Sequence, residues 1–187
     1  MSRQVELVTI FLACPSDLAA ERAIVRGVVA ELNRTWSKHT RVYFEVVGWE
    51  EVPSGTGSDP QDVVNRYIGD DYDLFLGLMG ATLGSPTGRA ASGTVEEYDR
   101  ALSRYREDPG AVELMFYFKD EDSLRKEGAN RQAAVEEFRT TLQRDVLDRT
   151  FGDVQDLTAI LRHDIGSIMQ QRWSLPRPGV QEKVEGE

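Results

Sequence analysis

The sequence predicts one α/β domain with about five mainly parallel strands between two layers of helices. Runs of β-branched and aromatic residues, almost unbroken by charge, are typical of strands buried on both faces of a parallel sheet. These runs alternate with segments whose apolar residues recur at helical spacing. A chain of 187 residues suffices for one well-buried domain but hardly for two. Right-handed crossovers with the strand order 2-1-3-4-5 would give a flavodoxin-like, three-layer sandwich with helices on both faces.

Each expected strand or helix is indicated by the spacing of its apolar residues and by the turn residues that end it. The strongest strand signal is the apolar run Leu74–Met79, and Pro15 separates the first strand from the first helix. The domain is expected to cover residues 1–173, followed by a linker or disordered tail at 174–187. Strands are expected at 7–13, 41–47, 72–79, 112–118 and 147–151, helices at about 17–35, 60–68, 95–106, 131–144 and 154–172, an exposed loop at 54–59 and a polar segment at 119–130.

Composition excludes several classes of function. The formal net charge is −10, and the basic residues are interleaved with acidic ones rather than clustered. A nucleic-acid surface needs a concentrated basic face, so no direct contact with nucleic acid is expected. The sequence shows no signal-peptide pattern and no apolar run close to the ~20 residues that span a bilayer. We therefore expect a cytoplasmic protein without membrane contact.

The residue types that usually carry metal or nucleophilic chemistry are scarce. The single cysteine, Cys14, lies in an apolar run and is interpreted as a small buried side chain rather than a reactive thiol. The two histidines, His39 and His163, are far apart, so neither a zinc site nor a metal cofactor is expected. No Gly-x-Ser-x-Gly elbow is present. The loop from Gly80 to Ala91 lacks the Lys-Ser/Thr ending of a Walker loop and is interpreted as a flexible lid.

The ligand site is expected at the carboxyl ends of the strands, where the order of the sheet reverses between the first and third strands. The loops that begin at Ala13, Gly48 and Gly80 meet there. Ser16 and Asp17 open the first helix at this edge. They either cap the helix or, with its backbone N–H groups, bind the phosphate or ribose of a ligand. Trp49 either stacks on a base or covers the core, and the core interpretation is preferred.

Two adjacent carboxylates, Glu96 and Glu97, open the helix that follows the strongest strand. Thr94 and Glu97 fit a capping box, in which Thr94 caps the helix and Glu97 reaches back to it. The alternative is catalytic. A carboxylate without a histidine or metal partner suits cleavage of an N-glycosidic bond, because it stabilises or traps an oxocarbenium-like centre. Nicotinamide leaves NAD as a neutral base, so that reaction needs no general acid.

Several segments resemble a bacterial family related to Toll/interleukin receptor (TIR) domains, whose members often precede NACHT or other STAND ATPases in defence proteins. The segments are Ile10–Leu18 with Glu21 and Arg22, Gly48–Glu50, Asp73–Leu78, Gly84–Thr87 and Ser92–Glu97. Many TIR domains hydrolyse NAD with a glutamate at the start of the helix after the third strand, and Glu97 matches that position best, with Glu96 as the alternative. Gly93–Glu97 also resembles the Gly-Thr-x-x-Glu segment of nucleoside deoxyribosyltransferases.

The resemblance implies an NAD glycohydrolase that is activated by self-association or by a fused sensor domain, with NAD as substrate and no cofactor. It also implies that the chains associate with one another through the loop at 51–60. The resemblance implies that Ser16 and Asp17 line the nucleotide pocket. Together with Cys14, Trp49, Gly80 and Thr94, they are the expected substrate-binding residues. Two alternatives stay open. The usual TIR entry after the first strand is replaced here by Ala13–Asp17, which keeps a non-catalytic adaptor module possible, and the same carboxylate chemistry could act on a free nucleoside or nucleotide.

Overall fold

A computed structural model describes residues 4–53, 60–129 and 131–173 of the chain. The interpretations of 54–59 as an exposed loop and of 174–187 as a linker or tail fall outside the described residues, as does most of the loop expected to mediate self-association. No helix among the described residues is both long enough and apolar enough to cross a membrane. The elements, in chain order, are β1 (Glu6–Ala13), η1 (Ser16–Leu18), α1 (Ala19–Thr40), β2 (Val42–Gly48), η2 (Trp49–Glu51), α2 (Pro60–Ile68), β3 (Leu74–Met79), α3 (Gly93–Glu107), β4 (Glu113–Lys119), α4 (Glu121–Lys126), α5 (Ala133–Leu142), β5 (Arg149–Phe151) and α6 (Val154–Arg172).

The five strands form one sheet in the order β2-β1-β3-β4-β5, and all four neighbouring pairs are parallel. The flavodoxin-like prediction is confirmed, including the strand order. β3 is buried along its whole length, as its uninterrupted apolar sequence predicted. β1 pairs with both β2 and β3, so the direction in which the chain adds strands reverses beside β1. This reversal fixes the crevice where open α/β sheets bind ligands.

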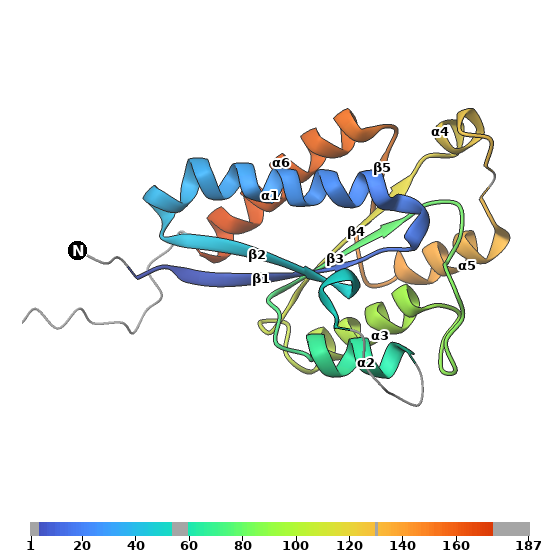
Figure 1. Cartoon of the computed structure of the whole chain (residues 1–187), viewed down its shortest axis with the longest axis horizontal. Coiled ribbons are helices and arrows are strands. Elements are labelled where there is room, and N and C mark those ends of the chain that lie inside the picture. Colours follow the sequence, from blue (N-terminus) through green and yellow to red (C-terminus); the bar gives the residue numbers. More distant parts are fainter. Residues whose placement is uncertain (1–3, 54–59, 130, 174–187) are drawn as a thin grey trace, which may run out of the picture.

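Helices cover both faces of the sheet (Figure 1). α1 and α6 pack on one face, where their apolar residues join those of β1, β2 and β3 in one core cluster. α3 and α5 cover the other face, and this second cluster is rich in aromatic side chains such as Tyr98, Phe116 and Phe138. α2 lies beside α3 on the same side of the sheet (Figure 1), and its first turns reach the carboxyl ends of the strands. The helix arrangement therefore leaves the switch point of the sheet bordered by α2, α3 and the start of α1.

Three local predictions were wrong. Ser16 does not cap the first helix, because the chain first makes the short 3-10 turn η1, with Pro15 at the capping position and no side-chain cap. α1 then extends to Thr40, beyond the predicted end near Thr35. The segment at 119–130, expected to be only polar, contains α4, whose N-cap Asp120 accepts a hydrogen bond from the Ser123 backbone. α5 and β5 are shorter than expected but lie within the predicted segments.

Candidate functional site

A cavity of about 350 Å³ opens at the carboxyl ends of β1, β2 and β3, where the strand order reverses. Segments that follow all three strands line it, and α2 and α3 close its side. Neither Lys, Arg nor His is among the described residues that line it. The lining consists of Cys14, Pro15, Ser16, Trp49, Gln61, Val64, Leu83, Gly84, Ser85, Pro86, Thr87, Gly93, Thr94 and Glu97. The rule for open parallel sheets thus leads to a concave site at the predicted edge.

The start of α3 presents the carboxylates, and its cap differs from the one predicted. Ser92, not Thr94, is the N-cap, and its hydroxyl accepts a hydrogen bond of 3.2 Å from the Val95 backbone N–H. The Thr94–Glu97 capping box is therefore wrong. Gly93 allows α2 to come close, because a Cβ at this position would lie 2.6 Å from the Gln61 side-chain oxygen. With the cap supplied by Ser92, the Glu97 side chain is available to the cavity.

Glu97 is the carboxylate that lines the cavity. It is only 7% exposed, and its Oε1 accepts a hydrogen bond of 2.9 Å from Gln61 Nε2. Burial raises the pKa of Glu97 to about 7, against the lowering effects of the Gln61 hydrogen bond and the Arg100 charge, while Glu96 adds a small further rise. A carboxyl group with this pKa changes its charge near neutral pH. Strongly perturbed groups in a crevice are typical of functional sites.

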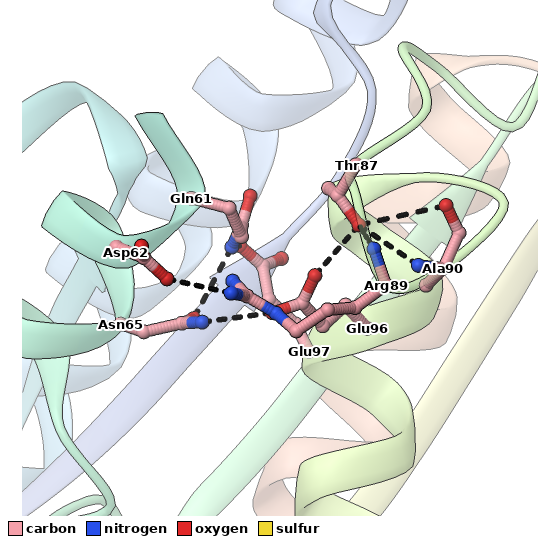
Figure 2. A network of polar contacts seen from close by, with 8 residues as sticks. All are labelled: Gln61, Asp62, Asn65, Thr87, Arg89, Ala90, Glu96 and Glu97. Carbon is pink, nitrogen blue, oxygen red and sulfur yellow. Dashed lines mark hydrogen bonds and ion pairs between the residues drawn. The ribbon is translucent and has the colours of Figure 1, made fainter. Parts of the chain in front are cut away.

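Glu96, although adjacent, faces a different environment. Its carboxylate accepts hydrogen bonds from Asn65 on α2 at 2.9 Å, from Thr87 at 2.7 Å and from Arg89 at 2.9 Å (Figure 2). Burial opposes its ionisation, but these donors outweigh burial and hold the pKa of Glu96 below its usual value. Glu96 does not line the cavity. Of the two glutamates, the structure thus brings Glu97 to the cavity.

Arg89 ties the loop after β3 to both helices. Its guanidinium forms ion pairs with Asp62 on α2 at 2.7 Å and with Glu96 on α3 at 2.8 Å. Thr87, in the same loop, also accepts hydrogen bonds from the Arg89 and Ala90 backbone N–H groups. Figure 2 shows that this loop approaches Glu96 from the side opposite to α2. The loop expected to be a flexible lid is therefore held near its C-terminal end by side-chain contacts.

The other predicted site residues divide into two groups. Cys14, Ser16, Trp49 and Thr94 line the same cavity as Glu97. Asp17 and Gly80 lie outside the lining but close to each other, since a Cβ at Gly80 would lie 3.3 Å from the Asp17 carboxylate. Burial raises the pKa of the Cys14 thiol to about 11, so the thiol stays protonated, in agreement with its interpretation as a buried, unreactive side chain.

Trp49 does not belong to the core, so the preferred interpretation was wrong. It starts the short η2 turn after β2, is 43% exposed and lines the cavity. The Arg22 guanidinium lies 5.4 Å from the centre of its ring and also pairs with Glu50. A turn at the end of β2 turns the indole away from the sheet. A flat aromatic surface is thereby available at the mouth of the cavity.

Sequence reasoning missed the polar partners of the two glutamates: Gln61, Asn65, Thr87 and Arg89. Gln61 and Asn65 are four residues apart and therefore lie on one face of α2. Their spacing was a usable signal for a polar helix face, but nothing in the sequence indicated that this face meets α3. Arg89 lies in a segment rich in Gly and Ser, whose composition favours a loop and hides the ion pairs that fasten it.

A second charge cluster lies at the end of β4, outside the cavity lining, with Lys119 and Glu21 buried and Glu127 exposed. Lys119 is 6% exposed and its ammonium group bridges Glu21, at 2.7 Å, and Glu127, at 2.6 Å. Burial opposes the charge, but the two carboxylates outweigh it and raise the pKa of Lys119. All three groups are satisfied by one another, which indicates a structural role. Among the described residues no group of three or more His, Cys, Asp and Glu side chains is arranged to hold a metal ion.

The comparisons with known proteins place the chain in a family. A family model described as a domain of unknown function (DUF4062) matches residues 9–166. The chain belongs to the DUF4062 family. The match runs from within β1 into α6, so it includes most of β1, the other four strands and the whole lining of the cavity. The site described above is therefore part of the DUF4062 domain itself.

No curated protein matches this DUF4062 chain. Among solved structures, the apo form of translation elongation factor SelB from Methanococcus maripaludis is similar, with a TM-score of 0.46 and 10% sequence identity. The match covers 92% of this chain and 37% of the SelB chain. A likeness at this level carries no argument about function, and the site must be interpreted from its own chemistry.

Proposed function

We propose that this domain is a TIR-like effector that cleaves the nicotinamide N-glycosidic bond of NAD, with Glu97 as the carboxylate at the ribose. One observation carries the proposal. Glu97 is buried, lines the cavity at the switch point and has a pKa of about 7. A carboxylate in such a place is ionised in a large fraction of molecules at neutral pH and is held in a site of low polarity, where it acts strongly on a developing positive charge.

The reaction balances without a further catalyst. The bond between ribose C1′ and the pyridinium nitrogen breaks, and its electron pair stays on nicotinamide, which leaves as a neutral molecule. The Glu97 carboxylate stabilises the oxocarbenium-like centre or forms an ester with it. Water then forms the new bond to C1′ and releases one proton to solvent. The products are nicotinamide, ADP-ribose and one proton.

The cavity offers suitable surroundings for such a substrate. The exposed ring of Trp49 can stack on a nicotinamide or adenine ring, and the hydroxyl groups of Ser16 and Ser85 line the cavity, where they can hydrogen-bond a ribose. The positive charge of the bound pyridinium beside Glu97 favours the ionised carboxylate. Binding of NAD thus increases the ionised fraction of Glu97, the form that acts on the ribose.

We also propose that self-association, or a fused sensor domain in a defence or signalling protein, controls the activity. The fastened loop that lines the cavity supports this part of the proposal. Arg89 and Thr87 connect the loop to Glu96, whose neighbour is Glu97. A partner that contacts this loop or α2 could change the cavity without touching the substrate.

The proposal is tested by incubating purified protein, dilute and artificially clustered through a fused oligomerisation tag, with NAD and following nicotinamide release. Turnover that depends on clustering is the expected result. A clustered protein that binds NAD and releases no nicotinamide would leave the non-catalytic adaptor as the better account. Absence of both binding and release would contradict the choice of substrate.

A second candidate is cleavage of a free nucleoside by the same carboxylate. The specific observation in its favour is that no basic side chain is among the described residues that line the cavity, so no charged group there pairs with a diphosphate. A panel of purine and pyrimidine nucleosides in the same assay separates the two candidates. Release of a base from a nucleoside, together with no release from NAD, would replace the first proposal with the second.

A further inference from the structure

A relay of side-chain amides connects the two glutamates through α2. Asn65 Nδ2 donates to Glu96 Oε1 at 2.9 Å, and Asn65 Oδ1 accepts from Gln61 Nε2 at 3.3 Å. Gln61 Nε2 also donates to Glu97 Oε1 at 2.9 Å. The path Glu96–Asn65–Gln61–Glu97 therefore runs from α3 to α2 and back (Figure 2). Each step is a direct hydrogen bond between side chains.

The relay has a direction, because an amide has a donor end and an acceptor end. The Glu96 carboxylate only accepts, so it holds the Asn65 nitrogen toward itself and the Asn65 oxygen toward Gln61. That oxygen in turn selects the nitrogen of Gln61, which then presents its other N–H to Glu97. If Asn65 were to turn over, its nitrogen would face Gln61 and would select the Gln61 oxygen. Glu97 would then meet an acceptor in place of a donor.

We propose that Glu96 is a positioning residue that sets, through Asn65 and Gln61, the hydrogen-bond donor facing Glu97. Glu96 is suited to this task because Thr87 and Arg89 hold its carboxylate from the other side. It is 7% exposed and does not line the cavity. Its part in the site is therefore indirect. The inference relies on the proposed function only for the catalytic role of Glu97.

The alternative is that Glu96 acts on Glu97 only as a neighbouring negative charge. The two explanations predict opposite changes in the Glu97 pKa when Glu96 is replaced. Removing a like charge lowers the pKa of Glu97, whereas losing the Gln61 donor raises it. Of these two influences on Glu97 the hydrogen bond is the larger. The neighbouring groups that bear on the titration are Arg100 and Glu96 on α3, Cys14 after β1, Gln61 and Asn65 on α2, and the Arg89–Asp62 pair beside Glu96.

Two variants of Glu96 separate these effects. Glu96→Gln and Glu96→Met both remove the charge, but only glutamine keeps an oxygen that can accept from Asn65. The Glu97 carboxyl group is titrated by carbon-13 NMR of glutamate-labelled protein, and its signal is assigned by its absence in Glu97→Gln. In Glu96→Met the midpoint should rise by about one pH unit, the effect of one lost hydrogen bond to a charged group. In Glu96→Gln it should stay or fall slightly.

A third measurement excludes a simple effect of apolar packing. Glu96→Met is repeated in a Gln61→Met background, which lacks the side chain that donates to Glu97. The rise in the Glu97 midpoint should then disappear. Equal downward shifts in both Glu96 variants, or a rise that persists without Gln61, would overturn the relay. If Glu96→Met does not fold, Asn65→Leu interrupts the same path one residue later and is compared in the same two backgrounds.

The outcomes also separate this inference from the proposed function. A relay that behaves as expected in a protein that releases no base from NAD or nucleosides would overturn the proposed function alone. An active enzyme whose Glu97 titration is lowered by both Glu96 variants would overturn the relay alone. In an active enzyme, the pH midpoint of the turnover rate should follow the NMR midpoint in each variant.

Discussion

Gln61 Nε2 and Glu97 Oε1 lie 2.9 Å apart, although the two residues are 36 positions apart in the chain. This single hydrogen bond joins α2 to α3 at the wall of the cavity. It is the strongest influence that opposes the effect of burial on the Glu97 pKa, which nevertheless lies near 7. The site thus contains a carboxyl group whose burial favours the neutral form, while the Gln61 donor and the Arg100 charge favour the ionised form.

Glu97→Gln should stabilise the protein above neutral pH. The folded protein binds a proton at Glu97 more tightly than the unfolded chain does, so wild-type stability falls as pH rises from about 4.5 through 7. Glutamine carries no charge to bury, so it removes this loss. We expect Glu97→Gln to gain up to about 3 kcal/mol in free energy of unfolding at pH 8 relative to pH 4.5, measured by urea denaturation.

The matched control is Glu137→Gln, which changes an exposed glutamate on α5. Its stability relative to wild type should be nearly the same at both pH values, because surface substitutions usually have small effects. If Glu97→Gln also shows no difference between pH 4.5 and pH 8, then Glu97 is not a buried carboxyl group with a raised pKa.

Trp49→Ala should weaken binding of NAD about 10-fold, since stacking of a base on an aromatic side chain contributes ~1–3 kcal/mol. The indole is 43% exposed and lines the cavity, so its removal should not disturb the core. Affinity is measured by calorimetry on protein without turnover, such as Glu97→Gln. Trp36→Ala is the matched control, because Trp36 packs against the core and Gly166. Unchanged affinity in Trp49→Ala would exclude stacking at this position.

Gly77→Ala should destabilise the fold by about 1–3 kcal/mol, the usual cost of forcing an extra methyl group into a packed core. A Cβ at Gly77 would lie 2.2 Å from the ring of Phe116, which stacks with Phe118 at 5.0 Å. Gly27→Ala is the matched control. No other group lies within 4 Å of a Cβ at this position in α1, so a gain of about 0.5–1 kcal/mol is expected from helix propensity. Urea unfolding curves should move in opposite directions.

Lys119→Met should cost about 3–5 kcal/mol, because Glu21 then keeps a buried charge without its partner. Adding Glu21→Gln should recover part of the loss, since the second change removes the uncompensated charge. The recovery is read from a double-mutant cycle of unfolding free energies. Strictly additive losses would show that the two side chains do not interact in solution.

Most of the fold was predictable because its signals are local. Buried parallel strands must be apolar on both faces, and the runs Ile10–Ala13, Leu74–Met79 and Met115–Phe118 satisfy this requirement along the sequence. Right-handed crossovers then restrict the possible sheets, and 2-1-3-4-5 is a common doubly wound order. α4 was missed because its six residues are almost all polar, and only Leu124 is buried.

The site was less predictable because its contacts join distant segments. Ser92 and Thr94 are both favourable caps by residue type, and the Thr94–Glu97 spacing favoured the wrong one. Glu97 instead meets Gln61 from another helix, a contact with no local signal. Trp49 was assigned to the core because a large apolar side chain at a strand end is usually buried, whereas η2 turns it outward.

The central claim is that Glu97 cleaves the nicotinamide bond, and release of nicotinamide from NAD by clustered protein at pH 8 tests it most directly. Wild type is compared with Glu97→Gln, which keeps the size of the side chain, and with Glu137→Gln as the surface control. We predict at least a ~100-fold loss of rate in Glu97→Gln, the scale on which a single catalytic group acts, and a wild-type rate in Glu137→Gln. Equal rates in wild type and Glu97→Gln would contradict the account.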